Sequence, residues 1–212
     1  HLFEGAACVT QQKQAINDLN VFPVPDGDTG TNMSLTIQTA VNELKKSEPA
    51  TVGEAAKITA GALLRGARGN SGVILSLLFR GLSKSVKGLT DMDGAQLAAA
   101  MAEGVTTAYG AVMKPAEGTV LTVSRLAAAR AVEAAQENPS AEYVLEQAIA
   151  AGYETLAQTI DMNPVLKKAG VVDAGGKGYL IILDGMLRAL RGEALPQVEE
   201  DGEKDQDKAD FG

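Results

Sequence analysis

Residues 93–112 read DGAQLAAAMAEGVTTAYGAV, and Asp93 and Gln96 at their start have the spacing of a helix capping box. In this motif the first side chain accepts a hydrogen bond from the backbone three residues on, and the later Gln or Glu reaches back. Thr51 and Glu54 repeat the spacing. Apolar residues recur with helical periodicity along almost the whole alanine-rich chain, and no convincing apolar/polar alternation indicates a sheet. The sequence therefore predicts an all-α protein.

Breaks between the periodic segments divide the chain into eight helices. Asn138-Pro139 and Asn163-Pro164 mark two of these breaks, because the residue before proline is pushed out of the α region. The strand-like residues 180–183 lie inside a longer helical pattern. Short connections favour a single bundle or helical barrel. The expected helices lie near residues 3–17, 31–46, 51–67, 71–87, 94–112, 119–137, 141–160 and 174–191, with a short turn after Pro164.

The composition is that of an ordinary globular domain. The chain has 212 residues, of which 45% are hydrophobic and 22% charged. Its only cysteine, Cys8, cannot form a disulfide within the chain, so a cytoplasmic location is expected. The only histidine is His1. A Ser-His-Asp triad or a histidine-ligated zinc site is therefore excluded for this chain acting alone.

The net charge of -8 is concentrated at the C-terminal end. Residues 196–212 hold seven acidic residues and two lysines, and almost no apolar ones, so they are expected to form a disordered acidic linker toward further domains. Residues 1–195 are expected to form the helical domain. That domain shows no basic stripe for nucleic acid and no apolar run long enough to span a membrane.

The most unusual segment is NVFPVPDGDTGTN, residues 20–32, between two predicted helices. Asp26 and Asp28 are separated by one glycine, and two such carboxylates repel each other unless a cation lies between them. Hard divalent metals prefer oxygen ligands of this kind. An ordinary Asp-Gly turn is the alternative interpretation. An EF-hand is excluded, because Thr31 stands where that loop needs glycine and Ile37 where it needs glutamate.

The residues after this pair begin a helix. Thr29, Thr31 and Asn32 place free backbone N–H groups and the positive end of a helix dipole beside the carboxylates. A helix start attracts anions, whereas paired aspartates attract cations. A metal–nucleotide polyphosphate is a common ligand that satisfies both.

Two further glycine-rich segments precede predicted helices. In RGARGNSG, residues 65–72, Asn70 or Ser71 is expected to cap the helix or contact a ligand oxygen, although a turn with two solvated arginines fits equally well. In GVVDAGGKG, residues 170–178, the P-loop spacing is absent, and a helix-capping turn at Asp173 is the alternative. Thr119 follows Glu117-Gly118 and has the position of an N-cap. A helical barrel could gather these glycine-rich starts at one rim around a nucleotide.

Four segments together carry a resemblance to a known family: Asn20 to Asn32, Gly66 to Gly72, Lys114 to Thr119 and Val172 to Gly178. They resemble the nucleotide-binding domain of the bacterial fatty acid kinase A subunit, which is related to the L subunit of dihydroxyacetone kinase. The resemblance implies an eight-helix barrel that holds ATP or ADP and two magnesium ions at one rim. It also implies phosphorylation of a fatty acid that a separate fatty-acid-binding B subunit presents, with further domains of the parent protein contributing to docking.

The resemblance also implies a set of site residues. Asp26 and Asp28 are the expected catalytic magnesium ligands, and Asn20 is the nearest match to a further upstream ligand. The expected nucleotide-binding residues are Thr29, Gly30, Thr31, Asn32, Asn70, Ser71, Gly72, Thr119, Asp173, Ala174 and Gly175.

Other functions and assignments stay open from the sequence alone. A kinase of small hydroxylated ketones and a non-catalytic nucleotide-binding module both fit the same motifs. A fatty carboxylate is already ionised and needs no general base, so the lack of an internal histidine favours it over an alcohol as acceptor. Leu75 or Met113 could contact the adenine or belong to the core. The sequence also leaves open whether the domain forms a homodimer.

Overall fold

The computed structural model describes residues 1–193, except for the side chain of Glu4, and the predicted linker at 196–212 lies outside the described residues. The described residues form helices and contain no strand. The elements are α1 (Leu2–Gln11), α2 (Lys13–Leu19), α3 (Thr29–Ser47), α4 (Val52–Gly66), α5 (Gly69–Ser85), α6 (Gly94–Ala111), α7 (Val120–Glu137), α8 (Ala141–Met162), α9 (Pro164–Ala169) and α10 (Ala174–Leu190).

The predicted all-α class is confirmed, and each predicted helix has a counterpart. The expected first helix is divided at Gln12 into α1 and α2, and the expected turn after Pro164 is the short helix α9. The strand-like residues 180–183 lie within α10, as the helical periodicity predicted. Asp93 and Gln96 form the complete capping box at α6. At α4, the Thr51 side chain accepts a hydrogen bond from the Glu54 N–H. The Glu54 carboxylate accepts from the Ala50 N–H instead of the Thr51 N–H, so this capping box is incomplete.

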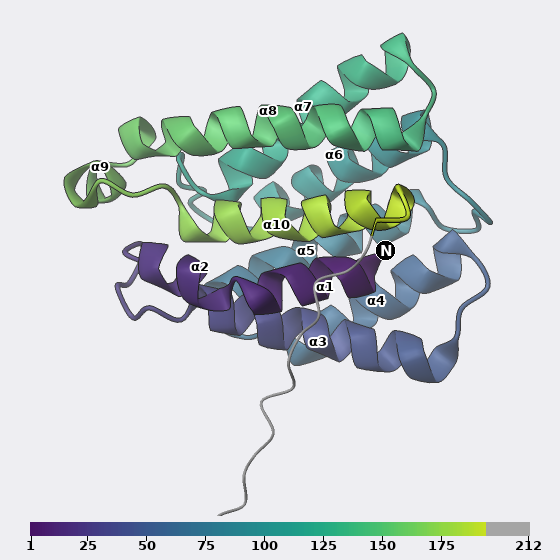
Figure 1. Ribbon diagram of the computed structural model, residues 1–212, viewed down its shortest axis with the longest axis horizontal. Coiled ribbons are helices and arrows are strands. Elements are labelled where there is room, and N and C mark those ends of the chain that lie inside the picture. Colours follow the sequence, from purple (N-terminus) through teal and green to yellow (C-terminus); the bar gives the residue numbers. More distant parts are fainter. Residues whose placement is uncertain (194–212) are drawn as a thin grey trace, which may run out of the picture.

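Eight long helices close into a barrel, as the sequence predicted. Going around the barrel, α1 packs on α3, and α4, α5, α6, α7, α8 and α10 follow until α10 packs on α1 again. The short helices α2 and α9 lie at the same end of the barrel (Figure 1).

Successive barrel helices run in opposite directions, so their starts alternate between the two ends. Helices α3, α5, α7 and α10 begin at the left end in Figure 1, which we call the rim, whereas α4, α6 and α8 begin at the opposite end, the far end. All four segments that the sequence singled out lie at the rim. The alternation brings them together although they are spread over most of the chain.

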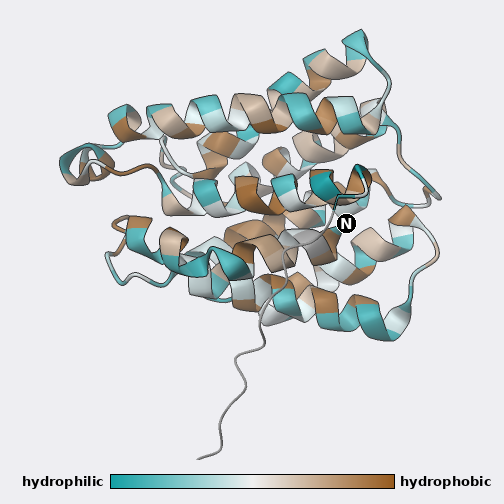
Figure 2. Ribbon diagram, viewed as in Figure 1, coloured by the Kyte–Doolittle hydropathy of each residue, from teal (hydrophilic) through white to brown (hydrophobic). Residues whose placement is uncertain are grey.

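The barrel interior is filled by apolar side chains, and brown and teal alternate along the helices in Figure 2. Ile37, Leu63, Val123 and Leu180 are fully buried between the helices. Because each helix is apolar on the inward face and polar on the outward face, closing the barrel removes most of the apolar area from water. None of the helices in residues 1–193 is both long and apolar enough to cross a membrane.

Candidate functional site

Two asparagines of α2 and its C-cap hold the loop that carries Asp26 and Asp28. The Asn20 side-chain oxygen accepts hydrogen bonds from the backbone N–H groups of Asp28 at 3.1 Å and Thr29 at 3.2 Å, and its amide donates to the Val24 carbonyl at 3.1 Å. Asn17 accepts from the Thr31 N–H at 3.0 Å and donates to its hydroxyl at 2.9 Å. The loop and the first turn of α3 are therefore tied to α2.

The carboxyl groups of Asp26 and Asp28 face each other. A hydrogen bond between these side chains, with some burial and the negative charge of Asp28, raises the pKa of Asp26 above its usual value. Asp28 is the N-cap residue of α3, yet its side chain does not cap the helix. Both carboxyl groups are thus available at the surface, and their mutual repulsion favours a proton or a cation between them.

This pair fits a magnesium ion better than a metal that needs a full protein cage. No group of three or more His, Cys, Asp or Glu residues in residues 1–193 is arranged to hold a metal. Magnesium is commonly bound by one or two carboxylates, while substrate phosphates and water complete its coordination. The Asp26–Asp28 pair meets that requirement. The predicted ligand role of Asn20 stays a prediction, since its amide already holds the loop.

Helix α5 begins with a turn whose N–H groups have no acceptor. Arg68 donates its backbone N–H to the Thr36 hydroxyl at 3.0 Å, and Gly69 follows with a φ of 62°, a left-handed conformation that favours glycine. Asn70 and Ser71 were expected to cap this helix, but they lie within its first turn, and the N-cap is Arg68, which makes no side-chain cap. The N–H groups of Gly69, Asn70 and Ser71 find no acceptor within residues 1–193.

These free N–H groups lie next to the start of α3. A Cβ atom on Gly69 would collide with the Asn32 side chain, and one on Gly72 would collide with the Thr36 hydroxyl. Gly72 is buried in this contact between the helices. The close approach therefore places the start of α5 beside the helix turn that follows the carboxylate pair.

The loop before α7 is held by its own charged network. Glu117 accepts hydrogen bonds from the Thr122 hydroxyl at 2.8 Å and from Arg125 at 3.0 Å, while Thr122 accepts from the Gly118 N–H at 3.0 Å. Thr119 is the N-cap residue, as predicted, but its hydroxyl donates to the Ala116 carbonyl at 2.8 Å and caps nothing. The side chain of Thr119 is half-buried at the rim.

Helix α10 begins at a buried acid. The Asp173 carboxylate caps the helix by accepting from the Gly176 N–H at 2.8 Å, which confirms the capping interpretation. Burial raises the pKa of Asp173 to about 6, although hydrogen bonds from the backbone of Gly176 and Val120 act in the opposite direction. Ala174 and Gly175 form the first turn, and Gly175 lies against Val120 at the start of α7.

The two ends of the barrel differ in how their helix starts are capped. At the far end, Thr51, Asp93 and Ser140 cap α4, α6 and α8 with their side chains. At the rim, Asp173 caps α10, whereas the N-cap residues of α3, α5 and α7 make no side-chain cap. The free N–H groups expected at Thr29, Thr31 and Asn32 are not found, because Asn20, Asn17 and the Asp28 carbonyl accept from them. The start of α5 does leave N–H donors and a positive dipole end that suit an anion.

Basic side chains add to the positive potential of the rim. Five exposed cations there form no ion pair within the described residues, as is also true of Arg80 and Lys84 elsewhere on the barrel. The unpaired rim cations are Arg65, Arg68, Lys114, Lys167 and Lys168.

The structure thus brings all the predicted site residues to one end of the barrel, but these residues differ in how far they are exposed to solvent. Asp26 and Asn70 are exposed, and Asp28, Thr31, Asn32, Ser71, Thr119 and Gly175 are half-buried. Asn20, Thr29, Gly30, Gly72, Asp173 and Ala174 are buried and serve packing or capping.

Sequence reasoning missed the residues that act through side-chain contacts. Asn17 and the hydrogen-bonding roles of Glu117 and Thr159 were not predicted. The hydrogen-bond partners of Asn17 and Thr159 lie 14 residues away along the chain. The two partners of Glu117 lie 5 and 8 residues away. Of these residues, only Asn17 could have been found from the sequence, because it stands three residues before Asn20 and therefore lies on the same face of α2.

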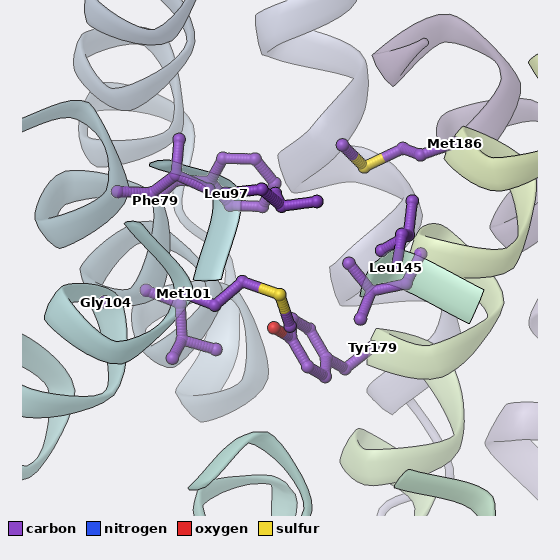
Figure 3. Close-up of a pocket in the computed structure, with 10 residues that line it drawn as sticks. Phe79, Leu97, Met101, Gly104, Leu145, Tyr179 and Met186 are labelled. Atoms are coloured by element: carbon purple, nitrogen blue, oxygen red, sulfur yellow. The ribbon is translucent and has the colours of Figure 1, made fainter. Parts of the chain in front are cut away.

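A separate apolar cavity lies inside the barrel, toward the far end. Ten residues of α5, α6, α8 and α10 line it, and Figure 3 shows Tyr179 reaching in from α10 toward Met101. Burial raises the pKa of Tyr179. The lining carries no charged side chain, so this cavity does not suit a polyphosphate.

The two residues considered for contact with the adenine differ in exposure. Leu75 is a core residue with 1% exposure, whereas Met113 is 96% exposed in the loop before α7. The interpretation of Met113 as a core residue is therefore wrong. Its side chain stands in solvent at the rim.

Comparison with known proteins identifies relatives of this fold and sequence. The barrel resembles part of the crystal structure of the dihydroxyacetone kinase of C. freundii, with a TM-score of 0.65 and 18% identity over 89% of this chain and 33% of that one. At this identity the likeness shows the fold, and it agrees with the predicted barrel type.

Closer sequence relatives are longer bacterial proteins. The chain is 45% identical to an uncharacterized protein of Staphylococcus haemolyticus, over 94% of this chain and 36% of the relative. It is 43% identical to protein YloV of Bacillus subtilis, over 92% of this chain and 35% of the relative. The chain therefore spans about a third of the length of these relatives.

A family of known domains matches most of the chain. The DAK2 domain matches residues 23–188, a range that includes Asp26, Asp28 and all four helix starts of the rim. On this match, the chain belongs to the DAK2 domain family.

Proposed function

We propose that the rim binds ATP with magnesium, and that the whole protein transfers the γ-phosphoryl group to the carboxylate of a fatty acid held by a separate fatty-acid-binding protein. The observation that carries this proposal is the position of the Asp26–Asp28 pair beside the uncapped start of α5. A carboxylate pair suits the cation and free N–H groups suit the phosphates, and one ligand satisfies both.

Each part of the rim has a role in this proposal. Asp26 and Asp28 would hold magnesium, which supplies charge neutralisation for the phosphates when it is bound. The N–H groups of Gly69, Asn70 and Ser71 would bind phosphate oxygens, with Arg68 directly before them and Lys114 in the rim loop before α7. Thr119 and Gly175 border the opposite side of the rim. These residues bind and orient, which is most of what phosphoryl transfer demands of a protein.

The lack of a histidine at the rim and the surface around the rim favour a carried carboxylate as the acceptor. Within residues 1–193 the only histidine is His1, which begins α1 at the far end, and an ionised carboxylate needs no base to accept a phosphoryl group. Large apolar side chains are exposed around the rim, which supports an acceptor delivered by another protein. They are Val24, Leu64, Val73, Met113 and Val165.

Phosphorylation of a small hydroxylated ketone is the second candidate. The fold match to the dihydroxyacetone kinase of C. freundii favours it. Such a hydroxyl acceptor must lose a proton during transfer, and a carboxylate of the rim or a group of another domain would have to accept it.

Reconstitution separates these candidates. The full-length protein is incubated with ATP and magnesium, and with either a fatty-acid-loaded carrier protein or dihydroxyacetone. Acyl phosphate formed only with the loaded carrier supports the proposal. Turnover of dihydroxyacetone without a carrier contradicts it and identifies the second candidate. Nucleotide binding without transfer to either acceptor also contradicts it and identifies a non-catalytic nucleotide-binding module.

A further inference from the structure

Among the described side chains, which do not include that of Glu4, Asp173 is the one buried carboxylate, with 5% of its surface exposed. A buried carboxylate is costly unless hydrogen bonds compensate for its lost hydration. Its surroundings therefore indicate what the fold gains from keeping an acid there.

The Asp173 side chain lies between the starts of two helices. It accepts from the Gly176 N–H of α10 at 2.8 Å, and the backbone of Val120, the first residue of α7, lowers the pKa of the carboxyl group as a hydrogen-bond donor would. Its own N–H donates to the hydroxyl of Thr159 in α8 at 3.1 Å. Thr159 is fully buried. Asp173 thus connects the starts of α7 and α10 with the last turns of α8.

The packing at this junction is tight. A Cβ atom on Gly175 would lie 3.5 Å from the Val120 side chain, and one on Gly176 would lie 3.0 Å from Val123. Gly118, just before α7, lies against Met162 at the end of α8. These glycines let the helix starts approach closely, but close packing alone does not fix which N–H groups face the rim.

We propose that Asp173 is a positioning residue that fastens the start of α7 to the start of α10 and so keeps Thr119 and Gly175 in place for the nucleotide. The inference rests on the proposed function. It differs from the predicted role of Asp173 as a nucleotide contact, because its carboxylate is buried and bonded to the protein's own backbone.

An aspartate suits this role better than asparagine or serine, which also cap helices. Its two oxygens can accept from two helices at once, whereas asparagine offers one oxygen and a donating amide group. Serine would cap α10 equally well but is shorter, so it does not reach a second helix. The causes of the Asp173 pKa shift are burial and the backbone hydrogen bonds of Gly176 and Val120, with no charged side chain among them.

The test compares two aspartate caps at opposite ends of the barrel. Asp173→Asn and Asp93→Asn both alter an N-cap, but only Asp173 lies at the rim. Magnesium-ATP affinity is measured by calorimetry for the full-length protein and both variants. We expect Asp173→Asn to weaken the affinity about tenfold, the effect of about one lost hydrogen bond to a charged group, because its amide cannot accept from α7, and Asp93→Asn to leave it unchanged. Equal affinities of the two variants would overturn the inference.

Asp173→Ser is the second variant, in case Asp173→Asn does not fold. It retains the cap of α10 and loses the bond to α7, so the same weakening is expected. A serine variant with wild-type affinity contradicts the role of the second bond.

Amide NMR of the unmodified protein tests the bond between the helices without any ligand. The N–H signals of Val120 and Gly176 should titrate together with a midpoint at about pH 6, because one carboxylate accepts from both. Titration of Gly176 alone would overturn the inference. If the wild-type protein binds no nucleotide, the proposed function fails, and this titration still decides whether Asp173 fastens the two helices.

Discussion

The side-chain oxygen of Asn20 lies 3.1 Å from the backbone nitrogen of Asp28 and accepts its hydrogen bond. The same oxygen accepts from Thr29, so one buried amide fixes the backbone at the point where the carboxylate pair meets α3. Asn20 occupies the position at which the sequence predicted a metal ligand. In the structure, its amide orients the residues that carry the carboxylates.

Replacing Asn20 with alanine should destabilise the fold and loosen the acidic loop. The substitution leaves the Asp28 and Thr29 N–H groups without their acceptor, which costs about 1–3 kcal/mol for a buried donor. Urea unfolding measures the loss. Asn42→Ala is the control, because Asn42 is exposed on α3 and bonds only to Gln38. Equal stabilities of the two variants would show that Asn20 does not hold the loop.

Neutralising Asp26 or Asp28 should weaken magnesium-dependent nucleotide binding. Asp26→Asn and Asp28→Asn each remove one charge of the pair, and we expect at least about a tenfold loss, since even an indirect metal contact is worth that much. Because the pKa of Asp26 is raised, protons compete with the cation, and wild-type affinity should fall as the pH is lowered. Calorimetry at several pH values measures both effects.

Asp161→Asn is the matched control for this pair. Asp161 is an exposed aspartate in the last turn of α8, which ends at the rim, and its replacement changes the net charge equally. If it weakens binding as much as the pair variants do, the effect is only one of overall charge.

Gly30→Ala should damage the junction of α2 and α3. A Cβ atom at residue 30 would collide with the Lys13 carbonyl oxygen and lie 2.9 Å from Ile16. Backbone cannot yield as a flexible side chain does, so we expect a loss of about 2–3 kcal/mol. Gly110→Ala in α6 meets nothing within 4 Å and should instead gain about 0.5–1 kcal/mol. Thermal unfolding of both variants checks the opposite signs, and a stable Gly30→Ala variant would contradict the close packing.

Asp173 should make the fold more stable at acidic pH than at neutral pH. Its pKa rises from 3.8 to about 6 on folding, so between these values the folded state binds more protons than the unfolded state. Stability from this group is complete below about pH 4 and is lost as the pH rises through about 6, by on the order of 3 kcal/mol. The difference in unfolding free energy between wild type and Asp173→Asn isolates it from other carboxylates. A difference that is constant from pH 4 to pH 7 would contradict the burial of the charge.

The helices could be predicted from the sequence because their signals are local. Capping residues such as Asp93 and breaks such as Asn163-Pro164 lie within one turn of the boundary that they set. The division of the first helix at Gln12 could not be predicted, since no glycine or proline marks it. There, α2 lies against Gly30, whose missing Cβ admits the Lys13 backbone, and this contact depends on the folded barrel.

The carboxylate pair and the glycine-rich helix starts could also be predicted from the sequence, because unusual residues are concentrated in short segments. What the sequence did not reveal is how each side chain is used. Asn70 and Ser71 have the residue types of caps, but the helix begins at the left-handed Gly69, two residues before the predicted start at 71. Likewise, Asp173 and Asn20 bond to backbone groups that only the closed barrel brings within reach.

Chemical-shift mapping with magnesium-ATP tests the central claim most directly. The account predicts that the ligand moves the amide signals of Asp28, Gly69 to Ser71, Thr119 and Gly175 together, at one shared affinity, and leaves those of the far-end caps Thr51 and Asp93 in place. Shifts confined to the far end or the inner cavity, or no shifts with magnesium-ATP at all, would contradict the account.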